Sequence, residues 1–224
     1  MSKIQKALIK SDPRQRAWIE VESSAIESNA GILRNLIADR CLLMAVVKAD
    51  GYGHGAQTVA RAALRGGADN LGIATLQEGI ELRESGFTCP ILLLGNLTKT
   101  KELETCLHFD LLPTLSSFRE AYLCQQIAEA IGRNFNVHLK VDTGMTRLGC
   151  DLNEALTLIE KIDSFNHVVL KGVYSHLALA DDDFSRVTRE QHQRFENLMR
   201  GLGERSNNLC CQLANSAGTL FDPG

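Results

Sequence analysis

The sequence contains no long hydrophobic run and no recognisable targeting segment. Residues 1–16, MSKIQKALIKSDPRQR, are basic but lack both a continuous apolar stretch and a small-residue cleavage site. They therefore match neither a secretory signal nor a membrane anchor. We expect a cytoplasmic protein with no membrane partner, in which residues 1–16 form a polar extension and residues 17–224 form the folded domain.

Neither sign of charge is in large excess. The net charge is −3 at pH 7 and the sequence pI is about 6.1, with acidic and basic residues interleaved along the chain. A polyanion needs a continuous basic surface, which this distribution does not supply. Nucleic acid is therefore not expected as a partner.

Paired cysteines at motif spacing are also absent. The seven cysteines include no C-x-x-C pair and stand in otherwise apolar segments. This pattern favours buried free thiols and argues against a zinc site of the usual spacing. No metal is expected.

What the sequence does have is a regular alternation, in a composition (44% hydrophobic, 23% charged) typical of one substantial core. Short runs, most of them apolar at consecutive positions, recur along the chain. A polar break follows each run, and a stretch with helical periodicity follows most of these breaks. The apolar runs are residues 42–47, 71–74, 91–94, 110–115, 135–141, 168–175 and 209–214. The helical stretches are residues 55–66, 76–85, 99–107, 117–130, 151–163 and 185–203.

Repeated units of this kind form either an open doubly wound sheet or a closed (β/α)8 barrel. No G-x-G-x-x-G follows the first strand, which disfavours a dinucleotide-binding sheet. Seven candidate strands occur from residue 42 onward, whereas a barrel of this type closes with eight. We predict an α/β protein with an incomplete (β/α)8 TIM-type barrel, seven of eight strands, and we expect a truncated sequence.

Four helix starts carry a side-chain acceptor followed three residues later by a glutamate, which satisfies orphan N–H groups in the first turn. The predicted acceptors are Ser24, Thr75, Ser117 and Asp151.

Polar clusters follow four of the apolar runs. Lys48 ends the first, residues 140–147 (KVDTGMTR) end the fifth, Ser175 and His176 end the sixth, and residues 215–218 (NSAG) follow the last. In a βα barrel the active-site loops converge at the carboxyl ends of the strands. The sequence therefore predicts that these clusters share one rim of the barrel.

Lys48 admits two interpretations. A lysine at a strand end can extend its ammonium group into water while its stem stays on apolar surface. Alternatively, a partly apolar pocket lowers the pKa of the amine and frees it to form an imine with an aldehyde such as pyridoxal phosphate. The glycines that follow, Gly51, Gly53 and Gly55, allow a ligand to approach the backbone, and the next helix N-terminus can attract a phosphate.

Three further rim residues each have a structural and a functional interpretation. Arg147 either forms a surface salt bridge or holds a carboxylate or phenolate oxygen with its planar guanidinium. His176 is either a hydrogen-bonded core histidine or a flat ring packed against a cofactor. Ser216 either caps a helix or donates its hydroxyl to a phosphate.

Four motifs carry a family resemblance: MAVVKADGYGHG, HLKVDTGMTRLGC, GVYSHLALAD and ANSAG. Their order and spacing, over roughly residues 17–220, resemble those of bacterial alanine racemase, the pyridoxal-phosphate enzyme that interconverts L- and D-alanine. Arg34 and the segment LGIATLQEGIELRESG also resemble the family's barrel. The resemblance implies pyridoxal 5′-phosphate as cofactor, L- and D-alanine as substrates, a homodimer, and supply of D-alanine for the cell wall.

The resemblance also implies which residues contact the cofactor. Lys48 is similar to the Schiff-base lysine, which serves as the base on one face of the substrate. Tyr52 resembles the tyrosine near the cofactor phosphate, and Ser216 resembles the serine that binds that phosphate. His176 is similar to the histidine packed beside the pyridine ring.

Three more positions resemble the family's substrate-binding residues. Arg147 matches the arginine that reaches the cofactor's phenolic oxygen and the substrate carboxylate. Met145 matches a position whose backbone N–H contacts that carboxylate across the dimer interface. Lys140 corresponds to a lysine that is often carbamylated and orients the arginine.

Some parts of the family are missing from this sequence. The second catalytic base is a tyrosine of a C-terminal β domain that the partner subunit supplies, and an arginine of the eighth strand faces the pyridine nitrogen. With Lys48 alone, a proton can be removed and returned on one face only. We therefore expect the chain as it stands to lack two-base racemisation, and we expect its gene to continue past Gly224.

Three alternatives remain open at this point. The chain could be a single-domain carrier that binds pyridoxal phosphate without racemase activity. It could belong to a related barrel racemase or decarboxylase that acts on a larger amino acid, or it could be an inert fragment that does not fold stably. A stop codon directly after Gly224 would favour the carrier.

Overall fold

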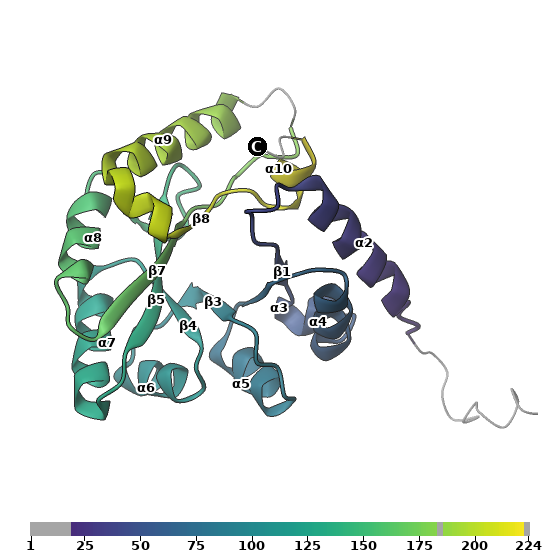
Figure 1. The fold of residues 1–224 in the computed structure, drawn as a ribbon, viewed down its shortest axis with the longest axis horizontal. Helices are drawn as coiled ribbons and strands as arrows, with labels where there is room; N and C mark the ends of the chain where they lie inside the picture. The colour runs from purple at the N-terminus through teal and green to yellow at the C-terminus, as the bar shows by residue number, and fades with distance from the viewer. Residues whose placement is uncertain (1–18, 183–185, 222–224) are drawn as a thin grey trace, which may run out of the picture.

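Seven parallel strands form one sheet in which each strand pairs with the next along the chain (Figure 1). In this computed structural model, which describes residues 19–182 and 186–221, the order is β1-β2-β3-β4-β5-β7-β8. The strands are β1 (Met44–Val46), β2 (Asn70–Ile73), β3 (Ile91–Asn96), β4 (Leu112–Leu115), β5 (Phe135–Asp142), β7 (Val168–Tyr174) and β8 (Cys210–Gln212). The short strand β6 (Cys150–Asp151) pairs with β5 off this path. The predicted polar extension, residues 1–16, lies outside the described residues.

Helices surround the sheet and connect its strands (Figure 1). They are α2 (Ser23–Leu36), α3 (Lys48–Tyr52), α4 (Ala56–Arg65), α5 (Leu76–Glu84), α6 (Thr100–His108), α7 (Phe118–Ile131), α8 (Ala155–Asp163), α9 (Arg186–Leu202) and α10 (Ser216–Phe221), with a 3₁₀ helix η1 (Gly203–Asn208) before β8. Helix α2 precedes β1 and packs against α4 and α10.

The strand order identifies the architecture. In a doubly wound sheet the order reverses, whereas here the pairing follows the chain from β1 to β8. Among the described residues, each terminal strand pairs with a single neighbour. The fold is therefore an incomplete (β/α)8 barrel, which confirms the prediction from the alternating pattern.

Strand β5 shows how the sequence produces two different faces. Val137, Leu139 and Val141 are fully buried and belong to the apolar core that the helices cover. The residues between them, His138 and Lys140, are also buried but point to the opposite, inner face because successive strand residues alternate. Both faces of β5 are buried, but its inner face is polar, so β5 alternates in type where strands such as β3 begin with consecutive apolar residues.

The inner face carries a polar column. The Tyr174 hydroxyl lies 2.8 Å from Thr114 Oγ1 and donates to the Leu94 carbonyl at 3.4 Å. His138 packs against Gly172, where a Cβ atom would lie 2.5 Å from the His138 ring. The column leads along β5 toward Lys140 at the carboxyl end of the barrel.

Two of the four predicted helix caps are confirmed. Thr75 and Ser117 each accept a hydrogen bond from the backbone of the glutamate three residues later, and that glutamate bonds back, so both form capping boxes. The prediction is wrong for Ser24, because Glu22 caps α2 and its carboxylate accepts from the Ser24 backbone. It is also wrong for Asp151, which pairs with β5 as part of β6, so that α8 begins only at Ala155.

The seven cysteines are free, but they are not all buried. Cys106, Cys124 and Cys150 lie in the core, and burial raises the pKa of the Cys106 thiol to about 12. Cys41 and Cys211 are exposed, so the expectation of buried thiols is wrong for them. Within the part of the chain that the structure describes, no helix is both long and apolar enough to cross a membrane.

Candidate active site

Lys48 lies at the start of a turn with unusual backbone geometry. The next four residues, Ala49 to Tyr52, all have positive φ angles, of 51°, 52°, 62° and 56°. A left-handed turn costs roughly 1–2 kcal/mol for each residue that carries a side chain. Backbone strain of this kind concentrates at functional sites, where the surrounding structure holds it in place.

Two carboxylates stabilise this turn. Glu78 on α5 accepts the backbone N–H of Ala49 at 2.7 Å, and its other oxygen accepts those of Ala74 and Thr75 at 2.8 and 3.0 Å. Asp50 accepts the backbone N–H of Ala56 at 2.7 Å, which joins the turn to the start of α4. The sequence identified Glu78 only as a partner in a helix cap, because its bond to a residue 29 positions away has no local signal.

Four predicted site residues come together at the carboxyl ends of the strands. His176, which is half-buried after β7, has a pKa below its usual value because of burial and the charges of Arg147, Lys140 and Lys48. Lys140, 5% exposed, also has a lowered pKa, again because of burial and the charges of Arg147 and Lys48, which outweigh Asp142. The predicted shared rim therefore exists for these four residues.

The cluster of Lys48, Lys140 and Arg147 is a concentration of positive charge. Across residues 19–182 and 186–221, none of these three cations lies within 4.0 Å of a carboxylate oxygen. Paired ions would neutralise one another, whereas this group retains its attraction for an anion. The donor set fits a ligand that carries phosphate or carboxylate groups.

Tyr52 and Ser216 occupy the edges of the candidate site. Tyr52 is 59% exposed, and the centroid of its ring lies 5.9 Å from Lys48 Nζ. Ser216 is exposed at the start of α10, where the Asn215 side chain accepts the Gly218 N–H and donates to the Leu177 carbonyl. Asn215 therefore caps this helix. Among the described residues, no hydrogen bond or charge interaction links Ser216 with the cation cluster.

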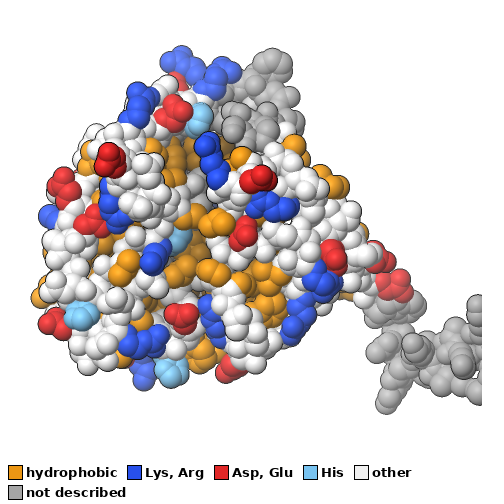
Figure 2. All heavy atoms as spheres, in the orientation of Figure 1, with side chains coloured by type: hydrophobic (Ala, Val, Ile, Leu, Met, Phe, Trp, Pro, Cys, Tyr) orange, Lys and Arg blue, Asp and Glu red, His pale blue; other side chains and the backbone are white. Residues whose placement is uncertain are grey.

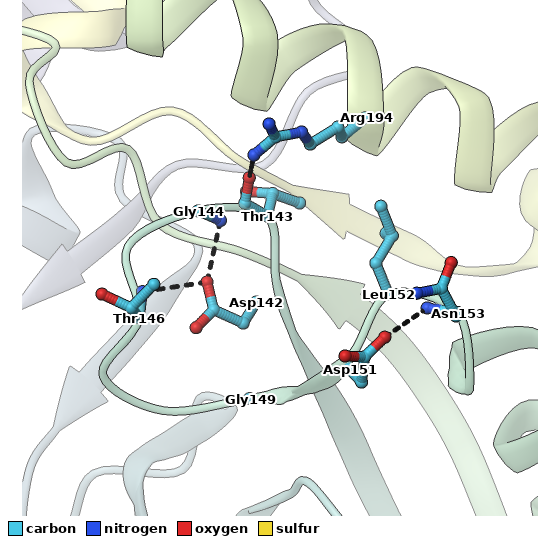
Figure 3. A pocket seen from close by; sticks show the side chains of 9 residues that line it. All are labelled: Asp142, Thr143, Gly144, Thr146, Gly149, Asp151, Leu152, Asn153 and Arg194. Carbon is cyan, nitrogen blue, oxygen red and sulfur yellow. Dashed lines mark hydrogen bonds between the residues drawn. The ribbon is translucent and has the colours of Figure 1, made fainter.

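The loop after β5 carries Met145 and Arg147. Asp142 holds it, since one carboxylate oxygen accepts the backbone N–H groups of Gly144 at 2.8 Å and Thr146 at 3.1 Å (Figure 3). Met145 is half-buried and Arg147 is exposed. Arg194 reaches this loop from α9 and donates to the Thr143 carbonyl at 2.8 Å (Figure 3).

A cavity of about 520 Å³ lies beside this loop (Figure 3). Its lining residues are Asp142, Thr143, Gly144, Thr146, Gly149, Asp151, Leu152, Asn153 and Arg194. Lys48, Lys140, Arg147 and His176 are not among them. In the face shown in Figure 2, hydrophobic side chains gather near the centre and most charged side chains lie around them.

Comparison with known protein families gives one match. The family described as alanine racemase, N-terminal domain, matches residues 21–223. Among curated proteins, an alanine racemase from Prochlorococcus marinus is 57% identical over 221 residues, which are 97% of this chain and 57% of that protein. An alanine racemase from Synechocystis sp. is 46% identical over 208 residues, which are 92% of this chain and 56% of that protein.

Solved structures give the same result. An alanine racemase from E. faecalis superposes with a TM-score of 0.84 at 32% identity, over 91% of this chain and 54% of the other. An alanine racemase from Clostridium difficile in complex with cycloserine gives a TM-score of 0.83 at 31% identity, over 92% of this chain and 57% of the other. The chain spans about half the length of the relatives that it matches.

Proposed function

The chain belongs to the alanine racemase family through the N-terminal domain, and we propose that it forms the pyridoxal-phosphate-binding part of an enzyme that interconverts L- and D-alanine. The observation that carries the proposal is the meeting of Lys48, Lys140, Arg147 and His176 at one end of the barrel.

The residues present fit the cofactor that the family uses. Pyridoxal 5′-phosphate is an anion with an aldehyde, and the candidate site offers a half-buried amine, Lys48, near the charged guanidinium of Arg147. We assign Lys48 to the aldehyde, Tyr52 and Ser216 to the phosphate, and His176 to one face of the pyridine ring. When bound, the cofactor supplies a conjugated ring that delocalises the negative charge left on the substrate α-carbon after its proton is removed.

Lys48 is proposed as a general base. Its Nζ atom takes the α-proton on one face of the substrate and returns it there, a type of step that typically contributes ~10²–10⁴-fold to a rate. The strained turn that follows Lys48 is held by Glu78 and Asp50, so the base is attached to fixed backbone. Fixed attachment reduces the entropy that orientation of the base would otherwise cost.

Arg147 is proposed to bind the substrate carboxylate, together with the backbone N–H of Met145. A planar guanidinium can donate two parallel hydrogen bonds to a carboxylate. Burial and the neighbouring cations lower the pKa of His176, which favours the neutral ring, a flat surface that adds no positive charge.

Lys140 is proposed to carry a carbamate. A carbamate forms when a neutral amine attacks carbon dioxide and releases one proton, and burial together with the neighbouring cations favours the neutral amine of Lys140. The product is an anion beside Arg147, which it would orient by charge and hydrogen bonding.

Racemisation needs a second base on the opposite face of the substrate. We propose that a partner subunit supplies it in a homodimer, as the resemblance to the family implies, and that the product D-alanine serves the cell wall.

The test combines cofactor binding and turnover. We expect the purified protein to bind pyridoxal phosphate covalently, with an absorbance band that is lost in Lys48→Ala. Lys101→Ala, which removes an exposed lysine of α6, is the matched control and should keep the band.

Turnover separates the two leading functions. Conversion of L-alanine into D-alanine by the full-length protein supports the racemase. Covalent cofactor binding without any conversion supports a carrier, and an unchanged band in Lys48→Ala removes that residue from its assigned role.

A further inference from the structure

Gln191 on α9 is a fully buried polar residue to which the proposed mechanism gives no task. Each polar atom of its amide is hydrogen-bonded. Oε1 accepts the backbone N–H of Ala178 at 2.9 Å, and Nε2 donates to the His176 carbonyl at 2.8 Å and to Thr143 Oγ1 at 3.2 Å. One side chain therefore bonds the segment after β7 and the segment after β5.

Thr143 is held at both of its oxygen atoms. Its hydroxyl lies 2.7 Å from Ser175 Oγ in addition to its bond with Gln191, and its carbonyl accepts from Arg194 of α9 (Figure 3). Thr143 is 1% exposed and Ser175 is 5% exposed, so water does not compete for these bonds. The start of the loop that carries Arg147 is thus fixed to α9 and to the strand end that carries His176.

Gly144, the next residue in the loop, allows Arg194 to lie close to the backbone. Gly144 has a φ angle of 141°, and a Cβ atom there would lie 2.9 Å from Arg194 Nη1. Asp142 then orders the rest of the turn toward Arg147 through the Gly144 and Thr146 backbone. Hydrogen bonds therefore tie the loop from Thr143 to Thr146, the residue directly before Arg147.

Packing alone does not account for a glutamine at this position. Phe195 and Leu198 supply the buried apolar contacts of α9, and an amide in the interior is unfavourable unless all its hydrogen bonds are made. The amide is suited to join two backbone segments, because it has an acceptor and two donors.

We propose that Gln191 is a positioning residue, which fixes the distance between His176 and the loop that carries Arg147. Its relevance to catalysis rests on the proposed function, since those two residues are assigned there to the cofactor ring and the substrate carboxylate.

The test measures the titration of His176 by NMR in the ligand-free protein. The pKa of His176 is lowered by burial and by the charges of Arg147, Lys140 and Lys48, which reach it from the loop after β5, from β5 itself and from the turn after β1. In Gln191→Met, which keeps side-chain length and removes the amide, the Arg147 loop should move away. The His176 midpoint should then rise toward the ordinary histidine value.

A matched control exists at the other end of the barrel. Gln125 on α7 is also buried, and its amide oxygen accepts the His167 backbone N–H at 2.9 Å. Gln125→Met should lose comparable stability and leave the His176 midpoint unchanged. Equal His176 midpoints in the two variants would overturn the proposal.

A second variant covers poor folding of Gln191→Met. Thr143→Val replaces the hydroxyl that Gln191 and Ser175 contact with a methyl group, and it should also raise the His176 midpoint. An unchanged midpoint in a folded Thr143→Val protein also contradicts the proposal.

Cofactor affinity tests whether the position that Gln191 fixes matters for binding of pyridoxal phosphate. We expect Gln191→Met to bind pyridoxal phosphate about tenfold more weakly than Gln125→Met does. Equal affinities would overturn the link to the cofactor site. Failure of the unaltered protein to bind pyridoxal phosphate would instead overturn the proposed function and leave the ligand-free titration valid.

Discussion

Glu78 accepts a hydrogen bond from the backbone N–H of Ala49, the residue that follows Lys48, at 2.7 Å. The same carboxylate closes the capping box of α5 and accepts the N–H of Ala74, the residue directly after β2. One side chain thus connects the left-handed turn, the second strand and the helix after it.

Replacement of this carboxylate should affect both stability and the site. Glu78→Gln replaces one acceptor with a donor that faces backbone N–H groups, so we expect the free energy of unfolding to fall by ~1–3 kcal/mol. Because the turn after Lys48 loses its tether, affinity for pyridoxal phosphate should fall as well. Urea unfolding and cofactor titration measure the two effects.

Glu120→Gln is the control for this prediction. Glu120 forms the equivalent capping box of α7 and accepts from the Ser116 and Ser117 backbone, but it has no contact with the turn after Lys48. It should lose stability and retain cofactor affinity. An equal loss of affinity in both variants would show that Glu78 acts through stability alone.

We expect Gly51→Ala, in the left-handed turn after Lys48, to lower the free energy of unfolding. Gly51 has a φ angle of 62°, and a Cβ atom there would lie 2.8 Å from Val59 Cγ2. The backbone strain alone is worth about 1–2 kcal/mol, and the contact with Val59 adds to it. Gly53→Ala is the comparison, because Gly53 also has a positive φ but no atom lies within 4 Å of its Cβ position. Urea unfolding should show a larger loss for Gly51→Ala, and equal losses would contradict the packing in this turn.

We expect the buried His138 to make the folded protein less stable in acid. Burial lowers the pKa of this histidine from 6.5 to about 4, so the folded protein holds the neutral ring and the unfolded chain binds the proton more readily. The contribution is fully present above pH 6.5 and is lost as the pH falls from 6.5 toward 4. The whole shift corresponds to about 3 kcal/mol.

Urea unfolding at a series of pH values tests this prediction. In His138→Gln the decline of stability between pH 6.5 and 4 should be smaller than in the unaltered protein, because the variant lacks the histidine whose pKa folding lowers. His192→Gln changes an exposed histidine and should leave the decline as it was. A decline of the same size in His138→Gln would contradict the assignment.

Lys140 predicts a detectable carbamate. With ¹³C-labelled bicarbonate, the protein should show a carbamate resonance that disappears in Lys140→Arg, because the guanidinium stays protonated and does not react with carbon dioxide. Lys161→Arg is the control, since Lys161 of α8 lies over the Phe118 ring of α7, in the outer layer of helices. A resonance that persists in Lys140→Arg would assign the carbamate elsewhere.

Local pattern was sufficient for the architecture. The seven strands appear where consecutive apolar residues predicted them, because a strand buried on both faces has that signature wherever it pairs. Thr75 and Ser117 cap their helices as expected, since a capping box spans only four residues. Lys48, Lys140, Arg147 and His176 meet at one rim because parallel strands end together.

The wrong and missed features have different causes: Ser24 loses the cap of α2 to Glu22, only two residues away, whereas the other features depend on tertiary contacts. Asp151 belongs to a strand and not to a helix cap, because the chain turns back after β5 and brings Asp151 alongside Asp142, with which it pairs. The left-handed turn after Lys48 persists because Glu78 reaches it from 29 residues away, and Gln191 joins segments that precede it by 13 to 48 residues. Periodicity and capping report interactions within a few residues, whereas strain and buried amides are stabilised by partners that only the folded chain brings into contact.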